Sequence, residues 1–249
     1  MEPEPGESNP SSLRLVNWNV EWASAHTARG QTIQERIAAT RPQVVCLTES
    51  HVNFFSTGHV ATADANYGYG DQGTRRKVVL WSQAPWRDVE IVGEATLPGG
   101  RLVAATTETP LGAVRFVAVC IPWKDAHVRT GRKDREPWED HLHYLDGLRR
   151  FLSNAPMQRL VLLGDFNQTI PRTHAPLPVF ERLSQLLESF TCATSGSFAD
   201  APKPAIDHIC HSPDLSATLN CVLSNEHAEI GQLSDHFGLS ATIRIAMGP

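Results

Sequence analysis

Short apolar runs broken by polar and turn residues predict a chain built mainly from β-strands. Most of the runs are bounded by Gly, Pro, Asn or Asp, as strands commonly are. The expected strands are residues 13–20, 44–47, 77–81, 89–96, 101–108, 113–121, 160–163, 205–212, 215–223 and 238–246. Apolar residues at helical spacing predict helices at 31–40, 137–152 and 179–190, with Pro137 in the first position of its helix. Residues 50–75 show neither pattern and are expected to form a loop.

The length and composition favour one domain with many strands and few helices. A chain of 249 residues that is 41% hydrophobic can bury one large core. We expect a single domain over residues 12–249. Residues 1–11, rich in Glu, Pro and Ser, read as a disordered tail.

Charge and cysteine usage limit the possible partners and the compartment. The net charge of -5 and the pI of about 6.1 give no global positive field, so contact with nucleic acid would need a local basic patch. Glu2 and Glu4 stand where a secretory signal needs positive charge, and no apolar run is long enough to span a membrane. We therefore expect a soluble, cytoplasmic monomer that does not bind membranes. The cysteines lack C-x-x-C spacing and are expected to be reduced; they are Cys46, Cys120, Cys192, Cys210 and Cys221.

The stretch LVLLGDFNQTI, residues 160–170, places polar residues directly after a buried strand. Leu160 to Leu163 read as a strand that is apolar on both faces, and it runs into Gly164, Asp165 and Asn167. On an extended chain Asp165 and Asn167 would point to the same side. A carboxylate beside an amide can hold and polarise a water molecule next to a phosphate. The alternative is an ordinary Asp-containing turn.

Other strand ends repeat this pattern. Asn17, Asn19 and Glu21 share one face of the strand at 13–20; either these amides have specific partners or the strand lies at a solvated sheet edge. Glu49 follows the strand at 44–47. The remaining polar groups at strand ends are Asp207, Asp235 and His236.

As an ordered set, N-V-E, T-E-S, G-D-F-N, I-D-H and S-D-H closely resemble the endonuclease/exonuclease/phosphatase family over residues 13–245. The resemblance implies an α+β protein with a four-layer α/β/β/α sandwich, in which two packed mixed β-sheets are flanked by helices. It also implies one catalytic domain that hydrolyses phosphodiesters or phosphomonoesters with Mg²⁺ or Mn²⁺.

The family roles carry over to this sequence as implications. Glu49 would be the principal metal ligand, assisted by Asp235, with Asn19 and Glu21 near the ion. Asp165 would orient or deprotonate the attacking water, and Asn167 would hold that water or a phosphate oxygen. His236, oriented by Asp207, would bind the phosphate.

Electrostatics supports a metal independently of the resemblance. Two carboxylates about 4 Å apart repel by roughly 4 kcal/mol at an effective dielectric constant near 20, so gathering Glu21, Glu49 and Asp235 requires a cation or protonation. Ligation by oxygen atoms suits Mg²⁺ or Mn²⁺, and the absence of clustered cysteines argues against structural zinc.

The sequence departs from the family pattern at Cys120. The family usually has a His or Tyr there that contacts the scissile phosphate or the leaving group, and a thiol is a poor replacement. Lys124, His127 or His141 could fill the gap. Two further family signals are missing: the tryptophan-rich segment typical of AP endonucleases, and the Trp-Cys-Asp-Arg segment of inositol phosphatases, in place of which residues 205–209 read AIDHI.

A basic segment offers the clearest hint of the substrate. Residues 124–135 lie between Trp123 and Trp138, and flanking aromatic rings beside basic groups suit a phosphate backbone with an unstacked base. The alternative is a solvated loop whose acidic residues cancel the charge. The candidate substrate-binding residues are Trp123, Lys124, His127, Arg129, Arg132 and Lys133, with Arg135 at the end of the segment.

The preferred hypothesis is a divalent-metal phosphodiesterase that acts on DNA or RNA, with nucleic acid as its substrate. A second hypothesis keeps the chemistry but replaces the substrate by a phosphorylated small metabolite or a lipid head group. A third is a binding module that retains the fold without catalysis; the presence of the acidic and His positions argues against it.

Overall fold

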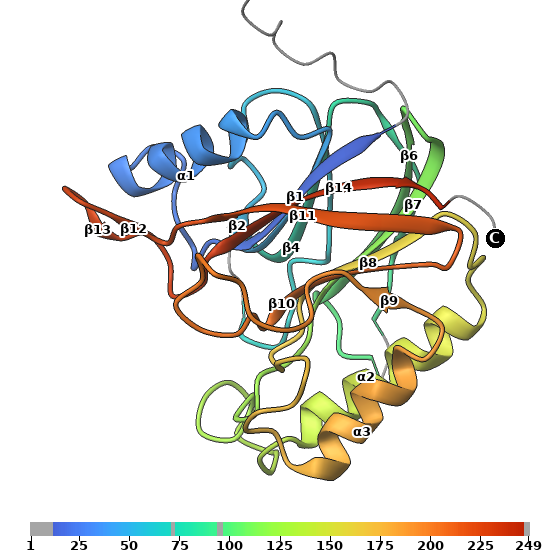
Figure 1. Ribbon diagram of the computed structural model, residues 1–249. Helices are drawn as coiled ribbons and strands as arrows, with labels where there is room; N and C mark the ends of the chain where they lie inside the picture. The colour runs from blue at the N-terminus through green and yellow to red at the C-terminus, as the bar shows by residue number, and fades with distance from the viewer. Residues whose placement is uncertain (1–11, 71–72, 94–96, 247–249) are drawn as a thin grey trace, which may run out of the picture.

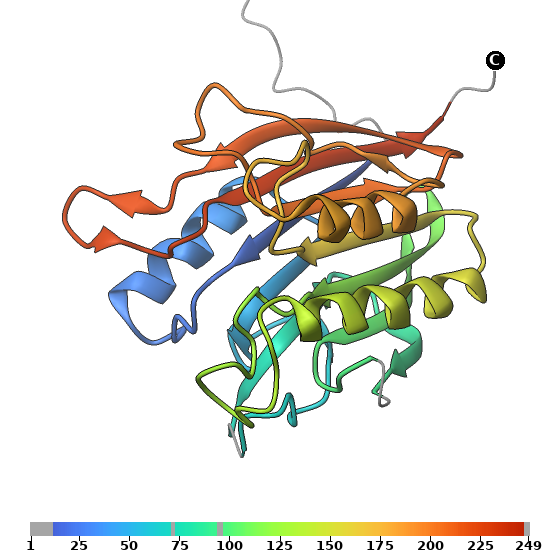
Figure 2. The ribbon, with the colours of Figure 1, turned by 90° about the horizontal axis from the view of Figure 1, so that it is seen from below.

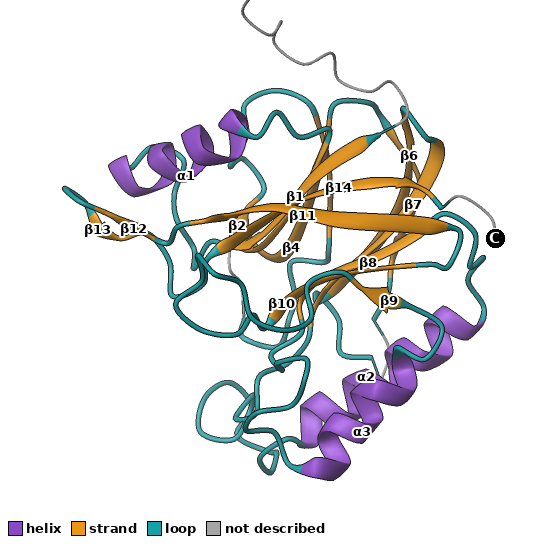
Figure 3. Cartoon of the chain, in the orientation of Figure 1, coloured by secondary structure: helices purple, strands orange, loops and turns teal. Residues whose placement is uncertain are grey.

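The chain folds into four layers, as the computed structural model shows (Figure 1 and Figure 3). The structure describes residues 12–70, 73–93 and 97–246. Helix α1 (Ala28–Ala39) covers the outer face of one sheet, and helices α2 (Glu139–Ser153) and α3 (Leu177–Leu186) cover the outer face of the other. This arrangement confirms the expected α/β/β/α sandwich of two mixed sheets. The tail at 1–11 lies outside the described residues.

The first sheet, which α1 covers, has the strand order β11-β14-β1-β2-β4-β3. Strands β1 and β2 run parallel and the other neighbours are antiparallel. The bounds are β1 (Leu13–Asn19), β2 (Val44–His51), β3 (His59–Thr62), β4 (Arg75–Ser82), β11 (Leu215–Leu223) and β14 (Gly238–Ile245).

The second sheet has the strand order β5-β6-β7-β8-β10-β9, with β7 and β8 parallel and the other neighbours antiparallel. A separate hairpin of β12 (Glu226–His227) and β13 (Gly231–Gln232) connects β11 to β14 of the first sheet. The bounds are β5 (Trp86–Ile91), β6 (Leu102–Thr109), β7 (Gly112–Cys120), β8 (Leu160–Asp165), β9 (Thr191–Cys192) and β10 (Asp207–His211).

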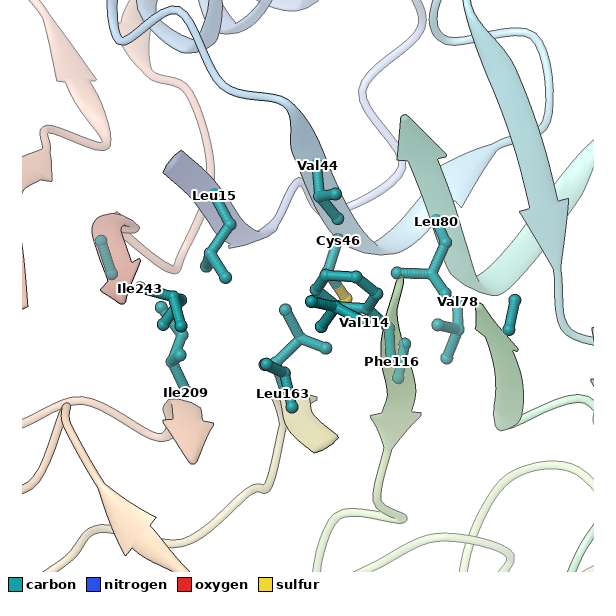
Figure 4. Packing of buried hydrophobic residues seen from close by; sticks show 14 of the residues in the cluster. Leu15, Val44, Cys46, Val78, Leu80, Val114, Phe116, Leu163, Ile209 and Ile243 are labelled. Carbon is teal, nitrogen blue, oxygen red and sulfur yellow. The ribbon is translucent and has the colours of Figure 1, made fainter. Parts of the chain in front are cut away.

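The main core lies between the sheets. Leu15 and Val44 of the first sheet point toward Leu163 and Phe116 of the second (Figure 4). All four side chains are at most 1% exposed, and burial of each contributes roughly 1.5–3 kcal/mol relative to exposure. The alternation of β1 sends Leu13 and Leu15 into this core and Val16 and Trp18 toward α1.

The helices begin and end where local chemistry allows. The Thr27 side chain accepts a hydrogen bond from the Gly30 N–H, which starts α1 before the expected residue 31. Helices α2 and α3 lie side by side on the second sheet (Figure 2), and an ion pair joins Arg182 of α3 to Asp146 of α2. None of the described helices combines the length and apolarity that a membrane crossing requires.

Asn17 lies inside the sandwich, not at a solvated edge. Strand β1 is paired on both sides, with β14 and β2, which makes the edge alternative wrong. The Asn17 side chain is fully buried, and its Nδ2 donates to the carbonyl oxygens of Gly164 at 3.0 Å and His208 at 3.2 Å. One amide of the first sheet therefore holds two strands of the second.

Several expected boundaries were wrong. Residues 50–75 are not a continuous loop: β2 extends to His51 and β3 occupies His59–Thr62, a strand too short and too exposed for an apolar alternation to reveal. The strand expected at 89–96 is β5, which begins at Trp86 and ends at Ile91; residues 94–96 lie outside the described part of the chain.

The helix expected from Pro137 begins at Glu139. Trp138 adopts a left-handed conformation with φ of 71°, and its N–H donates to the Lys124 carbonyl instead of entering the helix. Helix α3 ends at Leu186, short of the expected residue 190, and a turn follows. These differences of a few residues leave the order of elements unchanged.

Gly164 provides a test of the close approach between β7 and β8. A Cβ at this position, where φ is +133°, would lie 1.9 Å from the Val119 carbonyl oxygen. We expect Gly164→Ala to lower the free energy of unfolding by about 3 kcal/mol or more, from backbone strain and overpacking together. Gly196→Ala is the control: its φ is also positive, at +95°, but no atom lies within 4 Å. Equal losses for both variants in urea denaturation would contradict the steric argument.

Candidate active site

A pocket of about 240 Å³ lies where strand ends of the two sheets meet. Asn19 ends β1, Asp165 ends β8 and Cys120 ends β7. Most of the pocket lining is polar or charged, and two of its residues, Lys77 and Arg101, were not expected from the sequence. The lining residues are Asn19, Glu49, Lys77, Arg101, Cys120, Trp123, Asp165, Asn167, Asp235 and His236.

Asp165 is 2% exposed and is held by amide donors. Its Oδ2 accepts from Asn19 Nδ2 at 3.1 Å, and its Oδ1 accepts from the Asn167 backbone N–H at 2.9 Å. Burial, followed by the nearby Asp207 carboxylate, raises the pKa of Asp165 to about 7, while His236 acts in the opposite direction. A carboxyl with a pKa near neutrality is suited to accept a proton from water.

Asn167 reaches the pocket by a turn and not along an extended chain. Strand β8 ends at Asp165, and Asn167 has a φ of 53°. Its Nδ2 donates to the Ile121 carbonyl at 2.8 Å, which fixes the amide. The expectation of an extended chain through Asp165 and Asn167 was therefore wrong, although both side chains line the pocket.

Asp207 and His236 form a buried pair beside Asp165. His236 Nδ1 lies 2.5 Å from Asp207 Oδ2, and its Nε2 lies 3.7 Å from Asp235 Oδ1. Burial by itself would lower the pKa of His236, but the charge of Asp207, reinforced by its hydrogen bond, raises it to about 10. The imidazole is therefore cationic at neutral pH, with Asp207 fixing its orientation.

Strand β1 also holds the segment that carries His236. Ser234 Oγ donates to the Asn19 carbonyl at 2.7 Å and accepts from the His236 N–H at 3.2 Å. Trp18 Nε1 donates to the His236 carbonyl at 2.8 Å. The segment of residues 234–236 is thus tied to β1.

Glu49 is paired with a cation of the neighbouring strand. The β2–β4 register sets Glu49 opposite Lys77, and Lys77 Nζ lies 2.5 Å from Glu49 Oε1. The same ammonium lies over the rings of Trp22 and Tyr67, 5.1 and 5.5 Å from their centroids. Glu49 has a φ of 50°, a conformation that costs a non-glycine residue free energy and that is common at functional sites.

The expected metal ligands are only partly together. Glu49, Asp235 and Asn19 line the pocket, whereas Glu21 lies beside it: its Oε2 accepts from the Asp235 N–H at 3.2 Å and lies 3.7 Å from Arg29. The Asn19 side-chain oxygen accepts from the Glu21 N–H. Glu21 therefore supports the loop of Asp235 and does not line the pocket.

The residues present fit a divalent cation of the magnesium type. Glu49, Asp165 and Asp235 bring carboxylate oxygens to the pocket lining, and hard cations prefer such donors. A second group overlaps this lining: single ligand atoms of Asp165, Asp207 and His236 fall within 4.8 Å of one another. Asp207 Oδ1 is buried there without a hydrogen-bond partner among the described residues. The charge of His236 already offsets part of the repulsion in this second group.

The basic segment does not converge on the pocket. Only Trp123 of the candidate substrate-binding residues lines it. His127 is 1% exposed and stacks on Tyr69, while Arg132 and Arg135 pair with the buried Asp140 of α2. Lys124, Arg129 and Lys133 are exposed, and Lys124 lies 3.8 Å from Asp125.

None of the residues suggested to replace the family His or Tyr lines the pocket. Lys124 and His127 lie outside the pocket lining, and His141 is fully buried behind it. Cys120 itself lines the pocket, and burial raises the pKa of its thiol to about 12, so it stays protonated at neutral pH. The cation beside it is Arg101, whose Nη1 lies 4.0 Å from the Cys120 sulfur.

Comparison with family models decides the relationship. The model of the Endonuclease/Exonuclease/phosphatase family matches residues 16–236. This chain belongs to that family. Its members are phosphoric ester hydrolases, and the match runs from β1 to His236, across the whole site.

Solved structures with this family's fold cover nearly the whole chain. The 3′-5′ exonuclease from Neisseria meningitidis has a TM-score of 0.66 at 20% identity, over 94% of this chain and 100% of that one. D. rerio TDP2 complexed with single-strand DNA product gives 0.61 at 16%, over 94% and 99%. Sphingomyelinase C from Streptomyces griseocarneus gives 0.61 at 15%, over 93% and 99%. At these identities the likeness shows the fold. Comparison with curated proteins gives no significant match.

His141 joins the two loops that carry the pocket residues Trp123 and Asn167. Its Nδ1 donates to the Pro122 carbonyl at 2.7 Å, and its Nε2 accepts from Gln168 Nε2 at 2.7 Å, so the neutral ring satisfies both loops. Burial lowers the pKa of His141 to about 4, despite the opposing effect of the Pro122 hydrogen bond.

This depressed pKa predicts a pH-dependent stability. Between about pH 6.5 and pH 4 the unfolded chain binds a proton at His141 that the folded chain does not, so acidification removes stability, up to roughly 3 kcal/mol. We expect His141→Gln to lack this part of the decrease in urea denaturation from pH 6.5 to pH 4. His143→Gln, at an exposed neighbour on α2, should behave like the wild type. Parallel pH profiles for wild type and His141→Gln would contradict the assignment.

Proposed function

We propose that this protein is a divalent-metal-dependent phosphodiesterase that hydrolyses nucleic acid. The observation that carries the proposal is the convergence of Asp165, Glu49 and His236 on one pocket, from segments far apart in the sequence. A buried carboxyl with a pKa near neutrality, an oxygen-rich metal site and a cationic imidazole together supply what the hydrolysis of a phosphate ester needs.

Asp165 is the proposed base. In its ionised form it takes a proton from a water molecule in the pocket, while the Asn19 and Asn167 donors keep the carboxylate in one orientation. Water held between Asp165 and the phosphorus atom is then positioned for attack in line with the leaving oxygen.

His236 is the proposed phosphate ligand. Its Nδ1 is committed to Asp207, which leaves Nε2–H to donate to a non-bridging phosphate oxygen. Because the pKa of His236 is raised by Asp207, the ring stays cationic through neutral pH and stabilises negative charge that grows on the phosphate.

Glu49 and Asp235, with the Asn19 amide nearby, are the residues that would hold Mg²⁺ or Mn²⁺. Such an ion polarises a phosphoryl oxygen and offsets negative charge. Lys77 binds one oxygen of Glu49, so the carboxylate is already oriented by a cation from β4.

Trp123 and the fold's relatives favour nucleic acid as the substrate. The Trp123 side chain lines the pocket and is 45% exposed, a surface on which an unstacked base can lie. Among the proteins of similar fold, one is named as a 3′-5′ exonuclease and another was solved with a single-strand DNA product.

A small phosphorylated metabolite or a lipid head group is the second candidate. The pocket of about 240 Å³ is small, and the strongest basic residues of the 124–135 segment are occupied by Asp140. A sphingomyelinase also shares the fold. These observations support a compact phosphoester as the alternative substrate, and assays on oligonucleotides and on small phosphate esters separate the two candidates.

Removal of the base or the metal should abolish hydrolysis. We expect Asp165→Asn to lower kcat by about 10³-fold, because general base catalysis supplies roughly that factor. Chelation by EDTA should also abolish turnover, and Mg²⁺ or Mn²⁺ should restore it. The control Asp146→Asn removes a carboxylate on α2 that pairs with Arg182, outside the pocket lining, and should leave the rate unchanged. Full activity in EDTA would contradict the metal requirement.

Trp123→Ala should weaken nucleic-acid hydrolysis selectively. Loss of one stacking platform costs about 1–3 kcal/mol per base, so kcat/KM on labelled single-stranded DNA or RNA should fall about 5-fold to 150-fold. Hydrolysis of bis(p-nitrophenyl) phosphate should change less than hydrolysis of the oligonucleotide. Leu177→Ala, at a 53% exposed position on α3, is the control. Intact DNA and RNA, together with phosphate release from small esters, would favour the second candidate.

A further inference from the structure

Arg101 is a buried cation that lines the pocket. The sequence pattern did not indicate it, and the proposed mechanism gives it no role. It directly precedes β6, is 2% exposed and lines the pocket beside Cys120. Two donors bind its backbone carbonyl: the Cys120 N–H at 2.9 Å and the Tyr144 hydroxyl at 2.7 Å. The backbone that carries the guanidinium is therefore fixed.

The charge of Arg101 has no carboxylate partner within the described part of the chain. Its Nη1 donates to the Cys120 carbonyl at 3.3 Å and contacts the Cys120 sulfur at 4.0 Å. A guanidinium has five N–H donors, so most of them remain available. The Cys120 thiol does not supply the missing charge, because it is neutral at pH 7.

The other pocket cations are committed to anions of the protein. Lys77 binds Glu49, and His236 binds Asp207. Burial of an arginine without a counter-charge is unfavourable, and binding of an anion in the pocket removes that cost. Arg101 and Cys120 both line the pocket, so the guanidinium lies where an anion can reach it.

We propose that Arg101 binds the non-bridging oxygens of the substrate phosphate and of the phosphate product, as the pocket's own anion ligand. This inference rests on the proposed function and adds to it a substrate-binding residue. The planar fork of a guanidinium matches two phosphate oxygens at once, which a lysine ammonium does not. Together with His236, it would place cationic donors from both sheets around one phosphate.

The test measures phosphate binding and turnover separately. Inorganic phosphate is titrated into wild type, Arg101→Gln and Arg101→Lys by calorimetry in the presence of Mg²⁺. We expect Arg101→Gln to bind phosphate about 10-fold to 100-fold more weakly, as for the loss of a charge-assisted hydrogen bond, and Arg101→Lys to fall between the two. KM for a phosphoester should rise from wild type to Arg101→Lys and further to Arg101→Gln. The control Arg115→Gln removes a guanidinium that pairs with Glu90 on the same sheet, outside the pocket lining, and should bind phosphate like the wild type.

Two further measurements separate a contact with phosphate from support of the fold. Ethylguanidinium added to Arg101→Ala should restore part of the lost activity, whereas ethylammonium should not. The ¹⁵Nε resonance of Arg101 is identified as the one that is missing from the spectrum of Arg101→Lys. Phosphate should shift this resonance in the wild type. This readout does not require Arg101→Gln to fold.

Equal phosphate affinity in wild type and Arg101→Gln, or an unshifted Nε resonance in the wild type at saturating phosphate, would overturn the inference. A wild type that binds phosphate through Arg101 but hydrolyses no ester would instead leave the inference standing and refute the proposed function.

Discussion

Repulsion between two buried carboxylates is the constraint around which the site is built. Asp165 and Asp207 lie directly opposite each other on β8 and β10, with oxygens within 4.8 Å. At an effective dielectric constant near 20, two full charges at that distance repel by about 3.5 kcal/mol. The fold responds in two ways: the raised pKa of Asp165 allows one charge to be withdrawn, and His236 supplies a positive charge against Asp207. The acid–base character of the pocket follows from this arrangement.

The two sheets must keep a fixed alignment for these groups to stay together, and β1 provides it. Asn17 joins the first sheet to the backbone of β8 and β10, and Asn19 reaches the Asp165 carboxylate two residues later. Both amides lie on the face of β1 that points into the sandwich. Hydrogen bonds from these two polar residues therefore fix the position of one sheet relative to the other. Packing of leucine and valine side chains alone is less specific for that position.

The ordered motifs predicted the fold through their resemblance to the family, and Glu49 and Asp165 stood out because a carboxylate directly after an apolar run is unusual. Lys77 and Arg101 were missed because a cation at the start of a strand resembles an ordinary solvated end. Both residues are pocket residues because their side chains are largely buried, and the hydrophobic periodicity of the sequence does not predict burial at the end of a strand. The expectation that the basic segment binds substrate did not anticipate Asp140, because no sequence motif marks that residue. Asp140 is buried on α2 and forms ion pairs with Arg132 and Arg135. Strands of two residues, such as β9, are too short to give any periodic signal.

The left-handed backbone of Glu49 has a consequence for how this protein can change. A non-glycine residue in that region gives up about 1–2 kcal/mol, which glycine would largely recover. Selection for a more robust fold alone would therefore tend to remove the carboxylate from this position, and selection for chemistry would keep it. With Glu49 as the proposed metal ligand, thermal tolerance and turnover would thus compete at a single residue of β2.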